Sequence, residues 1–139
     1  MKPHVSVITL GVDDLPRAVA FYRDGLGLST QGIVGAEFEQ GAVAFFRLAG
    51  GLRLALWPRA SLARDTGLPM AAAAPTAMSL GHNVNSVEEV DAVMAQAQDA
   101  GARIIKPAQV TFYGGYAGYF QDPEGHLWEV VYNPGLEAL

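Results

Sequence analysis

The 139-residue sequence contains no cysteine. This absence excludes disulfides, thiolate metal ligands and a cysteine nucleophile. Positive charge is scarce as well, because 9 lysines and arginines stand against 14 aspartates and glutamates, giving a net charge of −5. Since a nucleic-acid-binding protein needs a basic face, we expect no nucleic-acid partner.

Long hydrophobic runs are also missing. The apolar stretch nearest the N-terminus, residues 5–11, is interrupted by Ser6 and Thr9. It is too short and too polar for a signal peptide or a membrane span, so we expect a cytoplasmic protein with no membrane partner. Half of the residues are hydrophobic, which is enough for the core of a single domain.

The first half of the chain predicts the order β-α-β-β-β. Residues 5–12 are rich in β-branched residues and predict a strand. Asp14 and Pro16 then mark a helix start, and Gly25 and Gly27 mark its end. Three further strands are predicted at residues 32–40, 42–48 and 52–57.

The second half predicts the same order. A strand at residues 77–84 precedes Ser86, which forms a capping box with Glu89 at the start of a helix that Gly101 ends. The remaining strands are predicted at residues 103–106, 116–121 and 126–133, with Pro107 ending the first of them. The last two form a hairpin around the turn at residues 122–125.

The two halves align with each other, residue 12 with residue 84 and residue 46 with residue 120. Such a period indicates a duplicated supersecondary unit. We therefore predict an α+β fold in which two βαβββ modules, residues 1–58 and 77–134, are joined by a proline-punctuated linker at residues 59–76. Two open sheets of this kind would enclose a cleft.

The strand pattern predicts which side chains face that cleft. On the first strands they are Val7 and Thr9, with Ser79 and Gly81 at the equivalent positions. On the last strands they are Arg53, Ala55 and Trp57, with equivalents Leu127, Glu129 and Val131. A carboxylate within an apolar strand is costly unless it has a partner, so Glu129 is the candidate catalytic acid or base. In a purely structural role it would accept hydrogen bonds from Ser79, Thr9 or Tyr116.

A small-molecule pocket requires aromatic walls and a few polar groups. The candidate substrate-binding residues are Thr9, Arg53, Trp57, Ser79, Phe112, Tyr113, Tyr116 and Tyr119. Ordinary core packing is an equally good interpretation for each aromatic residue taken singly.

Several short segments carry a resemblance to a known family. The sequence VDDL at residues 12–15 is followed by AFY at 20–22 and LGL at 26–28, and FQDPEGH at 120–126 leads to Glu129. In these segments the chain resembles the vicinal-oxygen-chelate superfamily, which includes glyoxalase I, extradiol dioxygenases, and bleomycin- and fosfomycin-resistance proteins. The resemblance implies paired βαβββ modules, frequent homodimers, and a metal in the cleft that binds a substrate through neighbouring oxygens.

The resemblance places the family's metal ligands on Val7, Ala55, Ser79 and Glu129. Only Glu129 is a strong ligand, and one carboxylate does not hold a divalent transition metal. We therefore assign no metal site and no cofactor, although Glu129 stays open as a ligand of a divalent metal. His4 and His82 are weaker alternatives that would require a change of strand register.

Three functions are compatible with these features. The first is a glyoxalase-like protein that binds a small molecule in the cleft and has largely lost the metal site. The second is a metal-dependent lyase or isomerase, similar to lactoylglutathione lyase, with Glu129 as its base. The third is a dioxygenase-like oxidoreductase, which ranks last because the sequence does not supply two histidines and a carboxylate for iron.

Overall fold

A computed structural model describes residues 1–135 of the chain. It divides into two compact units, a first module at Met1–Ala72 and a second module that begins at Ala73. Within the described residues, no helix combines the length and the hydrophobicity needed to cross a membrane.

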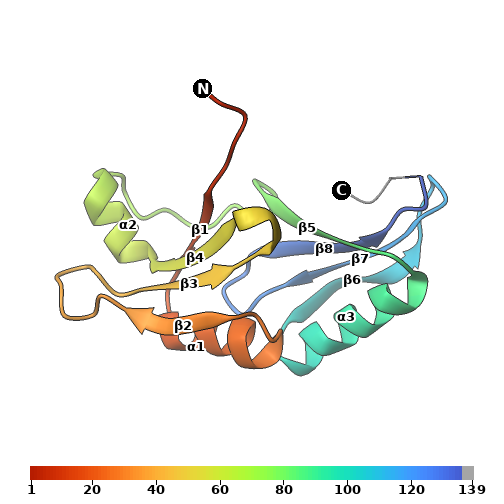
Figure 1. The fold of residues 1–139 in the computed structure, drawn as a ribbon, viewed down its shortest axis with the longest axis horizontal. Helices are drawn as coiled ribbons and strands as arrows, with labels where there is room; N and C mark the ends of the chain where they lie inside the picture. Colours follow the sequence, from red (N-terminus) through yellow and green to blue (C-terminus); the bar gives the residue numbers. More distant parts are fainter. Residues whose placement is uncertain (136–139) are drawn as a thin grey trace. The chain divides into compact units, whose positions relative to one another are not determined.

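The first module is a four-stranded sheet in the order β1-β4-β3-β2, with β1 parallel to β4 and the other pairs antiparallel (Figure 1). Helix α1 packs against β2, β3 and β4 and so covers one face of the sheet. The elements are β1 Val7–Val12, α1 Leu15–Ala20, the π-helical turn η1 Phe21–Gly25, β2 Thr30–Val34, β3 Val43–Arg47, the 3₁₀ turn η2 Ala49–Gly51, β4 Arg53–Pro58 and α2 Arg59–Thr66.

The second module repeats this topology. Its sheet has the order β5-β8-β7-β6, again with the first two strands parallel and the rest antiparallel. Helix α3 packs over β6, β7 and β8. The elements are β5 Ser79–Val84, α3 Val87–Asp99, β6 Arg103–Val110, β7 Tyr116–Gln121 and β8 Leu127–Tyr132. The predicted α+β fold with two βαβββ modules is thus confirmed.

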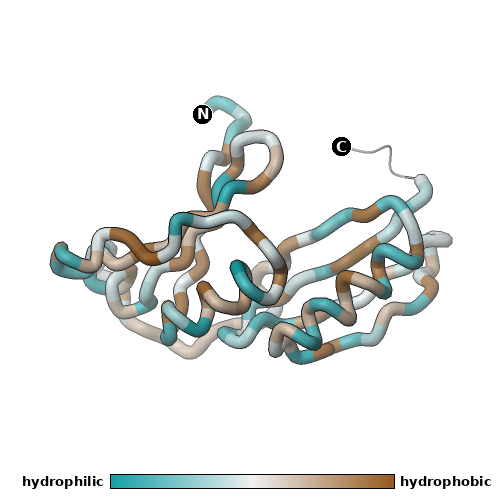
Figure 2. Tube along the Cα trace, turned by 60° about the horizontal axis from the view of Figure 1, so that its bottom comes forward, coloured by the Kyte–Doolittle hydropathy of each residue, from teal (hydrophilic) through white to brown (hydrophobic). Residues whose placement is uncertain are grey.

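Each module has its own core between helix and sheet. In the first, Tyr22 from the helical segment packs on Phe46, their ring centroids 5.9 Å apart. In the second, Val90 and Met94 are buried from α3 beside Phe120 of β7. Figure 2 shows the apolar and polar residues alternating along α3, as expected for a helix that buries one stripe.

The helix starts follow the predicted capping chemistry. The Asp14 carboxylate accepts a hydrogen bond from the Arg17 backbone N–H at 3.0 Å. The Ser86 hydroxyl accepts one from the Glu89 N–H at 3.1 Å, and the Glu89 carboxylate reaches back to the Asn85 N–H at 2.9 Å. The reciprocal bond therefore forms one residue earlier than in the standard capping box.

Three segments differ from the sequence-based expectation. Strand β6 continues through Pro107 instead of ending there, because β6 is an edge strand whose pairing with β7 is bulged on both sides of Lys106. Strand β2 ends at Val34, and residues 35–41 form a turn instead of extending the strand. The predicted linker begins with a helix, α2, and residues 67–78 that follow contain no helix or strand.

Candidate functional site

In each module, the sheet face turned away from the covering helix carries most of the predicted site positions. We call it the open face. In the first module, Val7 pairs with Arg53 and Thr9 pairs with Ala55, while the alternate residues, such as Leu10 and Leu54, are buried in the core. Val7, Thr9, Arg53 and Ala55 therefore share one face of the sheet.

The open face of the first module contains an apolar hollow of about 290 Å³, which we call the tryptophan hollow. It is lined by Thr9, Gln40, Gly41, Val43, Phe45, Ala55 and Trp57. The Trp57 indole N–H donates to the Gln40 carbonyl at 3.0 Å, and the Ser61 hydroxyl bonds the Gln40 side chain at 2.8 Å. These bonds hold the indole as a fixed wall of the hollow, which suits a planar apolar ligand.

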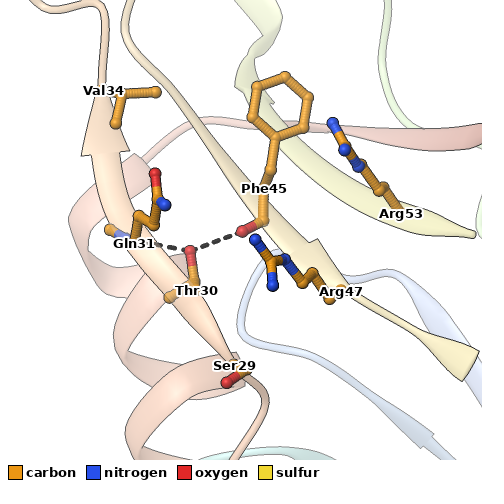
Figure 3. Close-up of a pocket in the computed structure, with 8 residues that line it drawn as sticks. Ser29, Thr30, Gln31, Val34, Phe45, Arg47 and Arg53 are labelled. Carbon is orange, nitrogen blue, oxygen red and sulfur yellow. Dashed lines mark hydrogen bonds between the residues drawn. The ribbon is translucent and has the colours of Figure 1, made fainter. Parts of the chain in front are cut away.

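A second hollow of about 420 Å³ lies beside the first and shares Phe45 with it; we call it the arginine hollow. It is lined by Ser29, Thr30, Gln31, Gly32, Val34, Phe45, Arg47 and Arg53. The Thr30 hydroxyl donates to the Phe45 carbonyl at 2.6 Å and accepts from the Gly32 N–H at 3.1 Å (Figure 3). Thr30 thereby fixes the bulged strand β2 against β3 at the edge of this hollow.

The open face of the second module carries Glu129 at its centre. Glu129 pairs with Gly81 on β5 and with Tyr119 on β7, and Tyr119 pairs in turn with Lys106 on β6. A Cβ atom added to Gly81 would meet no atom within 4 Å, so the space beside the carboxylate is open. Glu129, Tyr119 and Lys106 thus place a carboxylate, a phenol and an amine on neighbouring strands of one sheet.

The surroundings of Tyr119 in this sheet raise the pKa of its hydroxyl. Burial raises its pKa above the usual value of 10.0, and a hydrogen bond to the Glu129 carboxylate and the negative charge of that carboxylate raise the pKa further. The phenol is therefore a donor to Glu129 across the whole neutral range. In its structural role Glu129 is expected to accept from Ser79, Thr9 or Tyr116, and within the second module it accepts a hydrogen bond from Tyr119.

Tyr116 is predicted to line the open face, and the structure contradicts this. It lies three residues before Tyr119 on an unbulged strand, so its side chain points to the helix-covered face. There its hydroxyl donates to the Asp91 carboxylate of α3 at 2.8 Å, and this bond raises the pKa of Tyr116. Tyr116 thus fastens the helix to the sheet.

The remaining predicted residues occupy separate positions. Ser79 is exposed on β5 and pairs with Leu127, two residues along the strand from the pair of Gly81 and Glu129. Phe112 and Tyr113 lie in the turn between β6 and β7, stacked edge to face with centroids 5.2 Å apart, and Phe112 is fully exposed. Tyr113 is close enough to Tyr119 to contribute to the raised pKa of Tyr119.

The three histidines come from three different segments of the chain. His4 precedes β1 and is exposed. His82 pairs with Val130, so it is on the opposite face from Glu129, and it is exposed on the edge strand β5. His126 binds the buried Asp122 carboxylate through Nδ1 at 2.9 Å within the hairpin turn.

The residues at the positions where the resemblance places metal ligands supply few donor atoms. In the first module, Val7 and Ala55 offer only hydrocarbon, and in the second Ser79 is a poor ligand beside Glu129. Within residues 1–135, no group of three or more His, Asp or Glu side chains is arranged to hold an ion.

The sequence analysis did not identify Arg47 as a residue of the open face, although the sequence contains a signal for that position. The turn at Gly50 and Gly51 fixes the β3–β4 register, and that register pairs Arg47 with Arg53 on the open face. Gln40, which orients Trp57, was missed because its contact depends on the conformation of the turn at residues 35–41.

Comparisons with known proteins agree with this architecture. A glyoxalase-related enzyme from Fulvimarina pelagi is 35% identical, with a TM-score of 0.80 over 95% of this chain and 89% of that chain. Lactoylglutathione lyase from Agrobacterium tumefaciens is 24% identical, with a TM-score of 0.69 over 96% of this chain and 98% of that chain. A mutant of the fosfomycin resistance protein FosX from Listeria monocytogenes, complexed with Mn(II) and a dihydroxypropylphosphonic acid, is 25% identical, with a TM-score of 0.67 over 94% and 90% of the two chains.

Curated protein sequences gave no significant match. The sequence model of the glyoxalase/bleomycin resistance protein/dioxygenase superfamily matches residues 4–130, nearly the whole chain. The repeated βαβββ modules and the similarity to a glyoxalase-related enzyme agree with that match. The chain therefore belongs to the glyoxalase/bleomycin resistance protein/dioxygenase superfamily.

Proposed function

We propose that this protein binds a small, partly planar molecule on the open face of its sheets and has largely lost the metal site of its superfamily. One observation carries the proposal: Ala55, at a position where the family places a metal ligand, forms a wall of the tryptophan hollow together with Trp57 and Phe45. A hydrocarbon replaces the ligand, and an aromatic hollow of about 290 Å³ occupies the same part of the sheet face. This combination favours binding over metal-dependent chemistry.

Ligand screening with NMR mapping tests this proposal. Aromatic small molecules are added to the labelled full chain, and we expect chemical-shift changes at the Trp57 indole N–H and at the amides of Phe45 and Ala55. Phe45→Ala should weaken binding, because Phe45 lines both hollows. Phe38→Ala is the matched control, since Phe38 is an exposed phenylalanine outside both hollows. Binding that shifts only residues on helix-covered faces would refute the proposal.

A lyase or isomerase that uses Glu129 as a base is the alternative. The hydrogen bond from Tyr119 favours it, because a phenol beside the carboxylate is a second group able to exchange a proton with a substrate. The structural similarity to lactoylglutathione lyase agrees with this alternative at the level of the fold. If it holds, Glu129→Gln abolishes turnover of a substrate while leaving its binding measurable; a pure binding protein shows no turnover to lose.

The proposal also includes a homodimer, a cytoplasmic location and a functional division into residues 1–58 and 77–134, joined by residues 59–76. The homodimer is supported by the resemblance and by exposed apolar residues on the first sheet, including Ile33 and Val34. Sedimentation velocity at several protein concentrations tests it. A monomer at all concentrations would remove this part of the proposal.

A further inference from the structure

Arg47 and Arg53 are direct cross-strand partners in the antiparallel pair of β3 and β4. Side chains in such a pair emerge from the same face with Cβ atoms about 4.5–5.5 Å apart. Both arginines are exposed, and both line the arginine hollow. Two like charges placed opposite each other destabilise a sheet, so their juxtaposition calls for a compensating interaction.

The described part of the first module provides no carboxylate for either of them. Its exposed ion pairs engage other arginines, as Arg23 with Asp24, Arg59 with Asp13 and Arg64 with Glu39 show. All other residues around the arginine hollow are neutral. The two guanidinium groups thus face a hollow of about 420 Å³ with their charges uncompensated by the described residues of the module.

The repeat shows that the fold does not require this pair. At the equivalent positions of the second module, Gln121 pairs with Leu127, and neither side chain is charged. The same sheet geometry is thus formed with neutral partners in one module and with two arginines in the other. The charge pair is a property of the first module's open face.

The donors and acceptors around the hollow indicate what would bind there. Each guanidinium presents a planar fork of N–H donors that matches the oxygens of carboxylates and phosphates. In Figure 3 the Arg47 guanidinium is directed toward Thr30 and Gln31, on the same side of the sheet as Arg53. The Thr30 hydroxyl proton is already donated to the Phe45 carbonyl. A group that brings acceptors only and carries two negative charges would balance both arginines.

We propose that Arg47 and Arg53 form an anion subsite for a doubly charged tetrahedral oxyanion group, of the phosphate or phosphonate type, carried by the ligand. Phe45 separates this subsite from the tryptophan hollow, so the organic part of the ligand lies across Phe45 toward Trp57. The inference rests on the proposed function in placing the ligand on this open face, and it names the ligand's chemical class.

Isothermal titration of the full chain with phenyl phosphate, inorganic phosphate, benzoate and phenol tests the subsite. We expect phenyl phosphate to bind more tightly than benzoate or phenol. Arg47→Gln and Arg53→Gln should each weaken phenyl phosphate binding at least about 10-fold, the effect of losing charge-assisted hydrogen bonds. Arg53→Lys should also weaken it, because lysine keeps the charge but not the fork. Arg103→Gln, an exposed strand arginine of the second module, is the matched control and should leave binding unchanged.

The outcomes separate the subsite from the proposed function. Equal binding of phenyl phosphate by the native protein and both glutamine variants, or an equal loss in Arg103→Gln, would overturn the subsite. If phenol still shifted the Trp57 indole signal in that case, binding in the tryptophan hollow would stand. Phenyl phosphate binding that depends on both arginines, without any shift at Trp57, would support the subsite and contradict the aromatic hollow. No detectable binding of either phosphate probe would overturn the subsite.

Discussion

Tyr119 and Glu129 face each other directly across β7 and β8, and the tyrosine hydroxyl donates a hydrogen bond to the carboxylate. The two strands pair without a bulge from Tyr116 to Gln121, so the strand register itself sets this contact. Gly81 on the other side of Glu129 leaves the carboxylate accessible. Both ionisable groups of this pair thus lie on the open face of the second module.

The pKa of Tyr119 should fall part of the way back toward 10.0 in Glu129→Gln, because the variant removes the carboxylate's hydrogen bond and charge while burial remains. Titration of the tyrosine ring carbons by NMR measures this directly. Asp91→Asn is the control, since it should lower the pKa of Tyr116 and leave Tyr119 unchanged. An unaltered Tyr119 titration in Glu129→Gln would show that the hydrogen bond does not form in solution.

The same pair predicts how stability depends on pH. The pKa of Tyr119 is raised in the folded state, so its contribution to the free energy of unfolding is complete below about pH 10 and is lost as the pH rises through the raised value. Urea unfolding of Tyr119→Phe and of the native protein should therefore converge at high pH. A difference that widened with increasing pH would contradict the assigned sign.

Metal content should stay well below one ion per chain. Purified protein soaked with nickel, zinc, manganese or iron(II) is expected to retain little metal after desalting, because Val7 and Ala55 supply no donor atoms. Elemental analysis provides the measurement. Near-stoichiometric metal that disappears in Glu129→Ala would move the metal-dependent lyase ahead of the binding protein.

Arg47→Gln should stabilise the protein at low ionic strength. Removing one of two like charges that face each other across a strand pair relieves repulsion of up to about 1 kcal/mol. The gain should shrink in about 1 M salt, where exposed charges are screened. Urea unfolding of Arg47→Gln and of Arg103→Gln in phosphate-free buffer compares the paired arginine with an arginine outside the pair. Destabilisation by Arg47→Gln would mean that Arg47 already has a stabilising partner.

Gly118→Ala should destabilise the second module by about 1–3 kcal/mol, the usual effect of overpacking. The new Cβ would lie 2.8 Å from the Met94 methyl group and 3.0 Å from the Ala108 backbone nitrogen. Met94→Ala in the same chain should rescue only part of the loss, because the β6 backbone cannot withdraw as a side chain can. Gly81→Ala, which meets no atom within 4 Å, is the control at a strand glycine. Full rescue would show that the β6 backbone moves at its bulge to make room for the new Cβ atom.

Local chemistry made much of the fold predictable from the sequence. The caps at Asp14 and Ser86, the turn at residues 122–125 and the alternation along β8 each depend on residues close in sequence. The internal repeat then predicted two copies of the βαβββ unit. Pro107 was misinterpreted because its effect depends on the position of β6 at the edge of the sheet, which only the assembled module determines.

The candidate site was less predictable, for a similar reason. The faces of Thr9, Arg53 and Glu129 follow from strand parity, and the structure places them on the open faces. The prediction for Tyr116 was wrong because it ignored the strand parity that separates Tyr116 from Tyr119 and Glu129. The indole contact of Trp57 with Gln40 depends on a turn that sequence patterns do not specify.

The exposed stretch at residues 67–78 has a consequence for engineering. The strands of one sheet all precede this stretch, and the strands of the other sheet all follow it. A fluorescent reporter or an affinity peptide inserted there would interrupt no hydrogen-bond ladder and no helix. The repeat thus gives the chain a permissive insertion point near its middle.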